Sequence, residues 1–166
     1  MLSVKQLLYN TLRHRRSILE KASSISVSYL KMKQERDEDG SVITHVTAKC
    51  TGDTVPREVN LSLYGWGPEA KVWCSCDCPY FLYHTEVALM KRSNSDIIFS
   101  NGRTPRETNP GNVAHLCKHC AALLLHPELS RKMAKPTQPA KRDKQKTKPG
   151  KVAEKFKRHP NLPIER

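Results

Sequence analysis

The sequence contains no long apolar run, and nowhere do its 166 residues approach the ~18 consecutive apolar residues that span a bilayer. The N-terminal stretch also differs from a secretory signal, because its charges lie among and after its apolar residues instead of before them. We therefore expect a soluble, cytoplasmic protein without a membrane segment. Its length and 37% hydrophobic content predict one domain with a modest core.

Acidic residues are scarce at the C-terminal end, where residues 131–166 hold 3 Asp or Glu against 13 Lys or Arg. This segment supplies +10 of the formal +13, so residues 1–130 carry only +3. It also holds five of the 11 prolines, and its apolar residues are too sparse to offset the entropy of ordering the chain. We expect residues 131–166 to form a basic, flexible tail.

The first 130 residues have the patterns of an α+β fold. Ser3 and Gln6 have the spacing of a capping box, and an apolar stripe predicts a helix to about Glu20, within an N-terminal segment of residues 1–22. Apolar residues then alternate in four stretches, which predict strands near residues 25–29, 42–50, 59–63 and 70–76. Turn residues separate these stretches, so residues 23–130 should begin with a small antiparallel β-meander, with the N-terminal helix on or beside it.

The pattern changes after Pro79. A helical pattern covers roughly Tyr80 to Arg92, and the sequence DIIFS at residues 96–100 predicts a short strand. Glycines and prolines predict an irregular loop over residues 101–114. A last helix should begin close to Lys118 and stop before Pro127.

Two dense groups of cysteine and histidine stand out, WCSCDCP at residues 73–79 and LCKHC at residues 116–120. In a reducing compartment, closely spaced thiols are more often metal ligands than disulfides. A single activated thiol would not explain the additional cysteines, and a chance cluster of small buried residues would not explain their spacing. We therefore interpret the two groups as the halves of one metal site.

The spacing within each half is compatible with one ion. Residues i and i+2 of a strand project to the same side, so a Cys-x-Cys pair at a strand end can reach one metal. In a helix the same residues are about 200° apart, so Cys117 must lie at the cap and His119 in the first turn. The expected start of the last helix agrees with this requirement, and both the helix N-terminus and Lys118 favour a thiolate at Cys117.

The residues Cys76-Asp77-Cys78-Pro79-Tyr80-Phe81, with Cys117-Lys118-His119 and the apolar helix after them, resemble a SWIM-type zinc finger, whose pattern is Cys-x-Cys, a variable spacer and Cys-x-His. The resemblance covers Val72 to about Leu125 and implies one structural Zn²⁺ held by Cys76, Cys78, Cys117 and His119. The 38 residues between the pairs are long for the family and imply an inserted helix and loop. More loosely, the chain is similar to small SWIM proteins of tailed bacteriophages, which would place it in the host cytoplasm or the virion.

Other residues of the two groups leave alternatives open. Cys74-Ser75-Cys76 is a second Cys-x-Cys pair, so Cys74 is an alternate ligand, although Pro79 and the aromatic residues align with the other pair. His115 becomes a candidate ligand if the last helix starts earlier. Cys50 and Cys120 are expected to be core residues.

We expect no enzymatic activity, because four protein ligands close the coordination position that a catalytic zinc keeps open for water. Two functions fit the sequence. In the first, the zinc module binds nucleic acid, DNA in preference to RNA, largely without sequence specificity, through phosphate contacts from Lys141, Arg142, Lys144, Lys146, Lys148, Lys151, Lys155, Lys157 and Arg158. In the alternative, it is a zinc-stapled structural or assembly protein, for example a virion component, whose tail binds an acidic protein surface.

Overall fold

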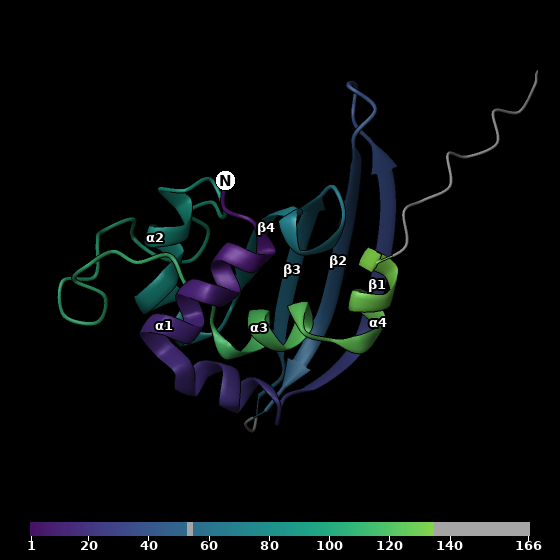
Figure 1. Ribbon diagram of the computed structural model, residues 1–166. Helices are drawn as coiled ribbons and strands as arrows, with labels where there is room; N and C mark the ends of the chain where they lie inside the picture. The colour runs from purple at the N-terminus through teal and green to yellow at the C-terminus, as the bar shows by residue number, and fades with distance from the viewer. Residues whose placement is uncertain (53–54, 135–166) are drawn as a thin grey trace, which may run out of the picture. The chain divides into compact units, whose positions relative to one another are not determined.

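The computed structural model describes residues 1–52 and 55–134 (Figure 1). Its four strands form one antiparallel sheet in the order β1-β2-β3-β4, which confirms the predicted α+β class and the β-meander. The elements are α1 (Val4–Ala22), β1 (Ser26–Arg36), β2 (Val42–Thr51), β3 (Arg57–Tyr64), η1 (Gly67–Glu69), β4 (Lys71–Cys76), η2 (Phe81–Thr85), α2 (Glu86–Met90), α3 (Lys118–Leu124) and α4 (Pro127–Ala134). No helix in these described ranges has the length and apolar character needed to cross a membrane.

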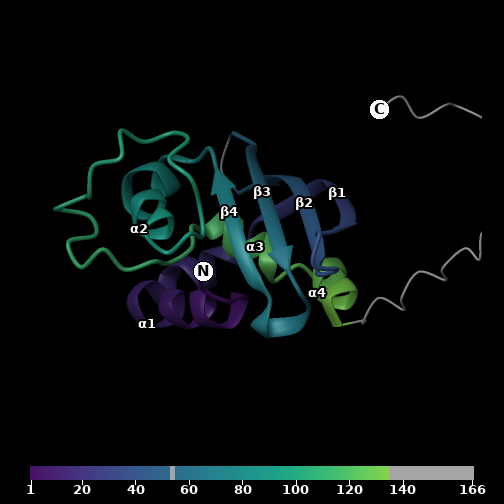
Figure 2. The same cartoon turned by 90° about the horizontal axis from the view of Figure 1, so that it is seen from above.

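One face of the sheet forms the core. Because strand residues alternate between faces, the buried residues of neighbouring strands line up across the sheet, as Val46, Leu61 and Cys74 do in adjacent register positions. Helix α3 packs on this face against β2, β3 and β4, and α1 packs on α3 (Figure 2); Leu7 of α1 and Leu123 of α3 are fully buried. The fold is therefore a two-layer arrangement of helices on an antiparallel sheet.

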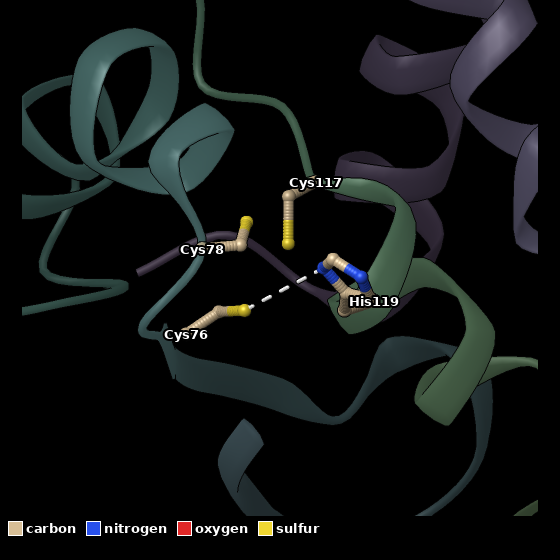
Figure 3. Close-up of side chains that lie close together, drawn as sticks. All are labelled: Cys76, Cys78, Cys117 and His119. Carbon is tan, nitrogen blue, oxygen red and sulfur yellow. Dashed lines mark hydrogen bonds between the residues drawn. The ribbon is translucent and has the colours of Figure 1, made fainter. Parts of the chain in front are cut away.

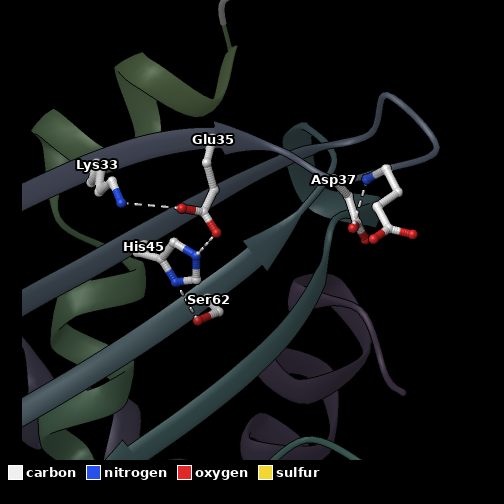
Figure 4. Close-up of polar contacts among 6 residues, drawn as sticks. Lys33, Glu35, Asp37, His45 and Ser62 are labelled. Atoms are coloured by element: carbon white, nitrogen blue, oxygen red, sulfur yellow. Dashed lines mark hydrogen bonds and ion pairs between the residues drawn. The ribbon is translucent and has the colours of Figure 1, made fainter.

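The opposite face of the sheet carries polar side chains (Figure 4). Glu35 of β1 lies 3.1 Å from His45 Nε2 of β2, and His45 Nδ1 lies 2.9 Å from the Ser62 hydroxyl of β3. Lys33 also contacts Glu35, and the hydrogen bond from His45 followed by the contact with Lys33 lowers the pKa of this exposed carboxyl. These cross-strand contacts tie three strands together on the solvent side.

Helix α1 begins with the predicted capping box. The Ser3 hydroxyl accepts from the Gln6 amide and the Gln6 side chain accepts from the Ser3 amide, so two otherwise unpaired donors are satisfied. The buried Asn94 side chain also bonds both the amide and the carbonyl of Leu2. Helical geometry is interrupted at Arg15, and Figure 1 shows α1 bending along its length.

The helix predicted after Pro79 is present, but a π-helical turn, η2, interrupts it at Phe81–Thr85 before α2 continues as an α-helix. The wider turn changes which side chains face inward, so Thr85 and Glu86 are buried while His84 is only half-buried. The sequence periodicity, which assumes 3.6 residues per turn throughout, could not anticipate this change.

The strand predicted at residues 96–100 is wrong. The amides of Ile98, Phe99 and Ser100 all donate to the carboxylate of buried Glu86, at 2.7–3.0 Å, so the chain curls around this side chain instead of pairing with the sheet. The three consecutive apolar residues of this stretch, Ile97, Ile98 and Phe99, are partly exposed. A buried carboxylate has replaced a neighbouring strand as the hydrogen-bond acceptor.

Helix α4 was not anticipated. Pro127 stops α3 as predicted, but it also occupies the first helical position of α4, where a missing amide hydrogen costs nothing. Leu129 and Met133, four residues apart, are buried on one face of α4. Helical structure therefore continues beyond residue 131, to Ala134.

Candidate metal centre

The structure brings together one donor atom from each of Cys76, Cys78, Cys117 and His119. These atoms all lie within 4.8 Å of one another, and Cys76 Sγ is 3.9 Å from His119 Nδ1. Figure 3 shows the three sulfur atoms and the imidazole ring pointing toward a common centre. We call this group the donor set.

Cys76 and Cys78 are positioned by the end of the sheet. Cys76 is the last residue of β4 and pairs with Val59, which fixes its side chain on the helix-covered face. The chain then turns, and the Phe81 amide at the start of the next helix donates to Cys78 Sγ at 3.3 Å. The strand end and the turn together direct both sulfurs to one point, as the Cys-x-Cys spacing predicted.

Cys117 and His119 are positioned by the start of α3. Cys117 is the N-cap, with extended backbone angles, and its sulfur accepts from the Cys120 amide at 3.4 Å. His119 lies in the first turn, so its ring reaches back toward the capping sulfur. This is the arrangement required for a Cys-x-His pair to address one ion.

The donor set has the chemistry of a metal site. All four side chains are buried, with exposed fractions of 0–3%. Three sulfurs and one imidazole nitrogen are ligands typical of a tetrahedral ion, and the 3.9 Å between Cys76 Sγ and His119 Nδ1 is only slightly longer than the separation of about 3.5 Å expected for ligands 2.0–2.3 Å from a shared centre. The residues therefore fit a single metal ion.

The acid–base properties of Cys117 and His119 are coupled. Burial opposes ionisation of Cys117, but hydrogen bonds from Cys120, Cys76 and Cys78 outweigh it and hold the pKa of this thiol well below its usual range. Burial likewise opposes protonation of His119, yet the Cys117 sulfur raises its pKa to about 9. Without a metal, the centre favours a thiolate at Cys117 beside a charged imidazole.

The other two thiols of the donor set differ from each other. The hydrogen bond with Cys117 acts to raise the pKa of Cys76, but those with Cys120 and Cys78 outweigh it and lower this pKa. Cys78 behaves in the opposite way. Its hydrogen bond with Cys117, followed by that with Cys76 and by burial, raises the pKa of Cys78. A thiolate at Cys117 or Cys76 disfavours ionisation of Cys78, because like charges repel strongly in a buried site. A divalent cation removes this conflict by neutralising several ligands at once.

Cys74, Cys50 and Cys120 lie next to the donor set and outside it. Cys74, the alternate ligand, is buried in β4 and is not among the four donors that converge. Cys50 and Cys120 are fully buried core residues, as predicted; their thiols point at the carbonyl groups of His119 and Ser75. Burial raises the pKa of Cys50 to about 12, which keeps this thiol neutral.

His115, the other candidate ligand, is committed elsewhere. Its Nδ1 lies 2.8 Å from the Val113 carbonyl, which can only accept, so Nδ1 carries the proton. Its Nε2 therefore accepts from the Tyr80 hydroxyl at 3.0 Å. Both ring nitrogens are used within the protein, and His115 is not part of the donor set.

A further pattern, His84-Thr85-Glu86 followed by Cys117-x-x-Cys120, has the residue types of a zinc deaminase centre and was not recognised from the sequence. The structure does not assemble such a centre. His84 stacks on Tyr80 with ring centroids 4.1 Å apart, and the Glu86 carboxylate is held by the three amides of residues 98–100. Neither side chain joins the donor set.

The predicted nucleic-acid contacts in the tail, from Lys141 to Arg158, lie outside the described residues. Comparison of the chain with models of known families, with curated proteins and with solved structures finds no match. The functional argument therefore starts from the donor set itself.

Proposed function

We propose that the protein is a non-enzymatic zinc-binding module of the SWIM type that binds nucleic acid, largely without sequence preference. The convergence of Cys76, Cys78, Cys117 and His119 is the observation that supports this proposal. Thiolate and imidazole ligands in a tetrahedral set are characteristic of zinc, and the Cys-x-Cys and Cys-x-His spacing is that of the SWIM pattern.

A structural role for the zinc follows from the number of ligands. Four buried protein donors leave no coordination position for water or substrate. The ion would instead hold the end of β4 to the start of α3 through two ligand pairs, with 38 residues of sequence between Cys78 and Cys117. Nucleic-acid binding is supported by the formal charge of +13, most of which lies in the basic tail.

Metal analysis of matched variants tests the zinc proposal. We expect one zinc per chain in the purified protein, retained in Cys50→Ser and lost in Cys117→Ser. Serine is a good N-cap residue, so Cys117→Ser keeps the cap of α3 and removes the ligand specifically. His119→Ala should also lose the metal, and Cys74→Ser should keep it. Purified, folded protein that contains no zinc and does not take it up would overturn the proposal.

A structural or assembly role is the second candidate, and one feature of the described chain favours it. Ile97, Ile98 and Phe99 form an apolar loop with exposed fractions of 38–50%. Native mass spectrometry of the nuclease-treated protein distinguishes the two functions. A stable complex with a partner protein that survives the removal of nucleic acid would favour assembly.

A further inference from the structure

A cleft of about 650 Å³ opens beside the donor set. Cys78 and His119 contribute to its lining, together with Ile18 of α1 and Tyr80 at the start of the inserted helix. This volume is in the range of pockets that hold a nucleotide-sized ligand. Its walls come from α1, β3, the start of α3 and the insert, by which we mean residues 79–116 between the two ligand pairs. The cleft therefore exists only when these parts are assembled.

The cleft is strongly basic. Arg15, Lys21, Arg57 and Lys118 line it, and Glu107 is the only acidic residue among its lining side chains. These cations come from three separate elements, α1, β3 and α3, so no local sequence pattern indicates that they share one surface. Several positive charges around one concave site attract an anion and raise its local concentration.

Arg15 is held in place for such a role. The break in α1 occurs at this residue, and its Nη2 donates to the Thr108 carbonyl of the insert at 2.8 Å. Burial raises the pKa of Tyr80 and the nearby Arg15 charge opposes this rise, while the Tyr80 hydroxyl is bonded to His115. Because the guanidinium has five donors, the bond to Thr108 fixes the group and leaves capacity for a phosphate.

The cleft also has an aromatic wall. Tyr80 and His84 line it and stack with an interplanar angle of 3°. Basic grooves that contain flat aromatic side chains are typical of sites for single-stranded nucleic acid, in which phosphates meet cations and bases meet rings. A concave site of this size admits an individual phosphate and its nucleoside more readily than the convex surface of a duplex.

We infer that this cleft binds the phosphate backbone of a single-stranded nucleic acid next to the metal centre. The inference rests on the proposed function, because Cys78 and His119 line the cleft and a bound metal fixes their positions. It assigns to the folded body a contact surface that is separate from the tail.

The test measures binding of a fluorescent oligothymidine of about 12 nucleotides, within the range of known single-strand site sizes, across a salt series. The full chain is compared with Lys21→Gln/Arg57→Gln, which removes two cations from the cleft. Lys31→Gln/Lys71→Gln is the matched control, since both of these lysines are exposed and neither lines the cleft. Zinc content and far-ultraviolet circular dichroism establish that each variant is folded.

Each lost phosphate contact should reduce the slope of log affinity against log salt by about 0.7, so the cleft variant should lose about 1.4 relative to the control. Inorganic phosphate and thymidine monophosphate, added as competitors, show whether the site also accepts free phosphates. Identical affinity and slope in the two variants, or stronger binding of a duplex of the same length, would overturn the inference. Lys21→Glu, a single exposed change, repeats the test if the double variant is poorly folded. A zinc-free wild type would contradict the proposed function instead.

Discussion

The sulfur of Cys117 has two roles, as acceptor of a backbone hydrogen bond and as a member of the donor set. As N-cap of α3 it accepts the Cys120 amide, and in the donor set it faces Cys76, Cys78 and His119. Hydrogen bonds to the sulfur favour its ionised form, which is the form that a metal requires. The cap of α3 and the neighbouring hydrogen bonds therefore favour the thiolate form of Cys117 before any ion is bound.

The pKa shifts at this centre predict proton release on metal binding. Below pH 9 His119 is charged in the metal-free protein, and the raised pKa of Cys78 keeps this thiol protonated. Zinc must displace both protons, so about two or more should be released per ion at pH 7, and affinity should fall as pH is lowered. Calorimetry in two buffers of different ionisation enthalpy measures this number. A pH-independent affinity between pH 6 and 8 would contradict the prediction.

The pKa shifts of His119 and Cys117 give the stability of the metal-free protein two opposing pH dependences. The raised pKa of His119 gives stability that is complete below its unfolded value of about 6.5 and is lost as pH rises toward 9. The lowered pKa of Cys117 gives stability that is complete above its unfolded value and is lost only as pH falls through its low folded value. Between pH 6.5 and 9 the His119 contribution falls with rising pH while the Cys117 contribution grows, so the net pH dependence of stability is small and metal affinity is the better measure of the site.

At the scale of elements, the buried side chain of Glu86 holds the insert between the two ligand pairs in its conformation. This α2 side chain is fully buried and collects three amides of the following loop. It replaces a short strand that the sequence DIIFS suggested. Sequence patterns indicate which residues are apolar. They do not indicate that one carboxylate will accept the backbone hydrogen bonds of three consecutive loop residues.

Substitution of Glu86 should therefore loosen the loop. Glu86→Ala removes the acceptor of three hydrogen bonds and should destabilise the fold by about 2–3 kcal/mol, whereas Glu86→Gln, which keeps one oxygen, should cost less. Denaturant unfolding gives the loss, and hydrogen exchange of the Ile98, Phe99 and Ser100 amides locates it. Glu58→Ala, at an exposed position of β3, is the control. Unchanged exchange at these amides in Glu86→Ala would argue against this role.

The elements that the sequence predicted correctly are those whose signals are local. Alternation in β2 and β3, the Ser3–Gln6 cap and the cap at Cys117 each depend on residues close in sequence. Other features lack a local signal. Packing between distant segments determines the π-turn at Phe81–Thr85 and the break at Arg15, and helix α4 depends on a proline that both ends one helix and begins the next. Such features have no periodic signal.

At the scale of the whole molecule, the metal centre joins the sheet to the helical layer. Cys76 belongs to β4 and Cys117 to the start of α3, while α3 packs on α1 and on three strands. The β1–β2 hairpin lies farther along the sheet order and contributes none of the four donors. Stability should accordingly depend on the metal to different degrees in different regions.

Removal of the metal tests this uneven dependence. Because structural zinc supplies on the order of 10 kcal/mol in small metal-folded units, chelation should unfold at least the region from Cys76 to Leu125. Hydrogen exchange after addition of a strong chelator should show protection lost first there and later in the paired residues of β1 and β2. Readdition of zinc should restore the pattern. Equal loss of protection throughout the described chain would indicate a single cooperative unit instead.

The insert has one more consequence, which concerns cleavage of the chain. Arg103 and Arg106 are exposed in the irregular loop between the two ligand pairs, so trypsin can cut there. Each of the two resulting fragments would keep half of the donor set, Cys76 and Cys78 on one and Cys117 and His119 on the other. The fragments should therefore migrate as one species under native conditions and separate when the metal is withdrawn. The ion would then link the two fragments in place of the peptide bond that the protease has cut.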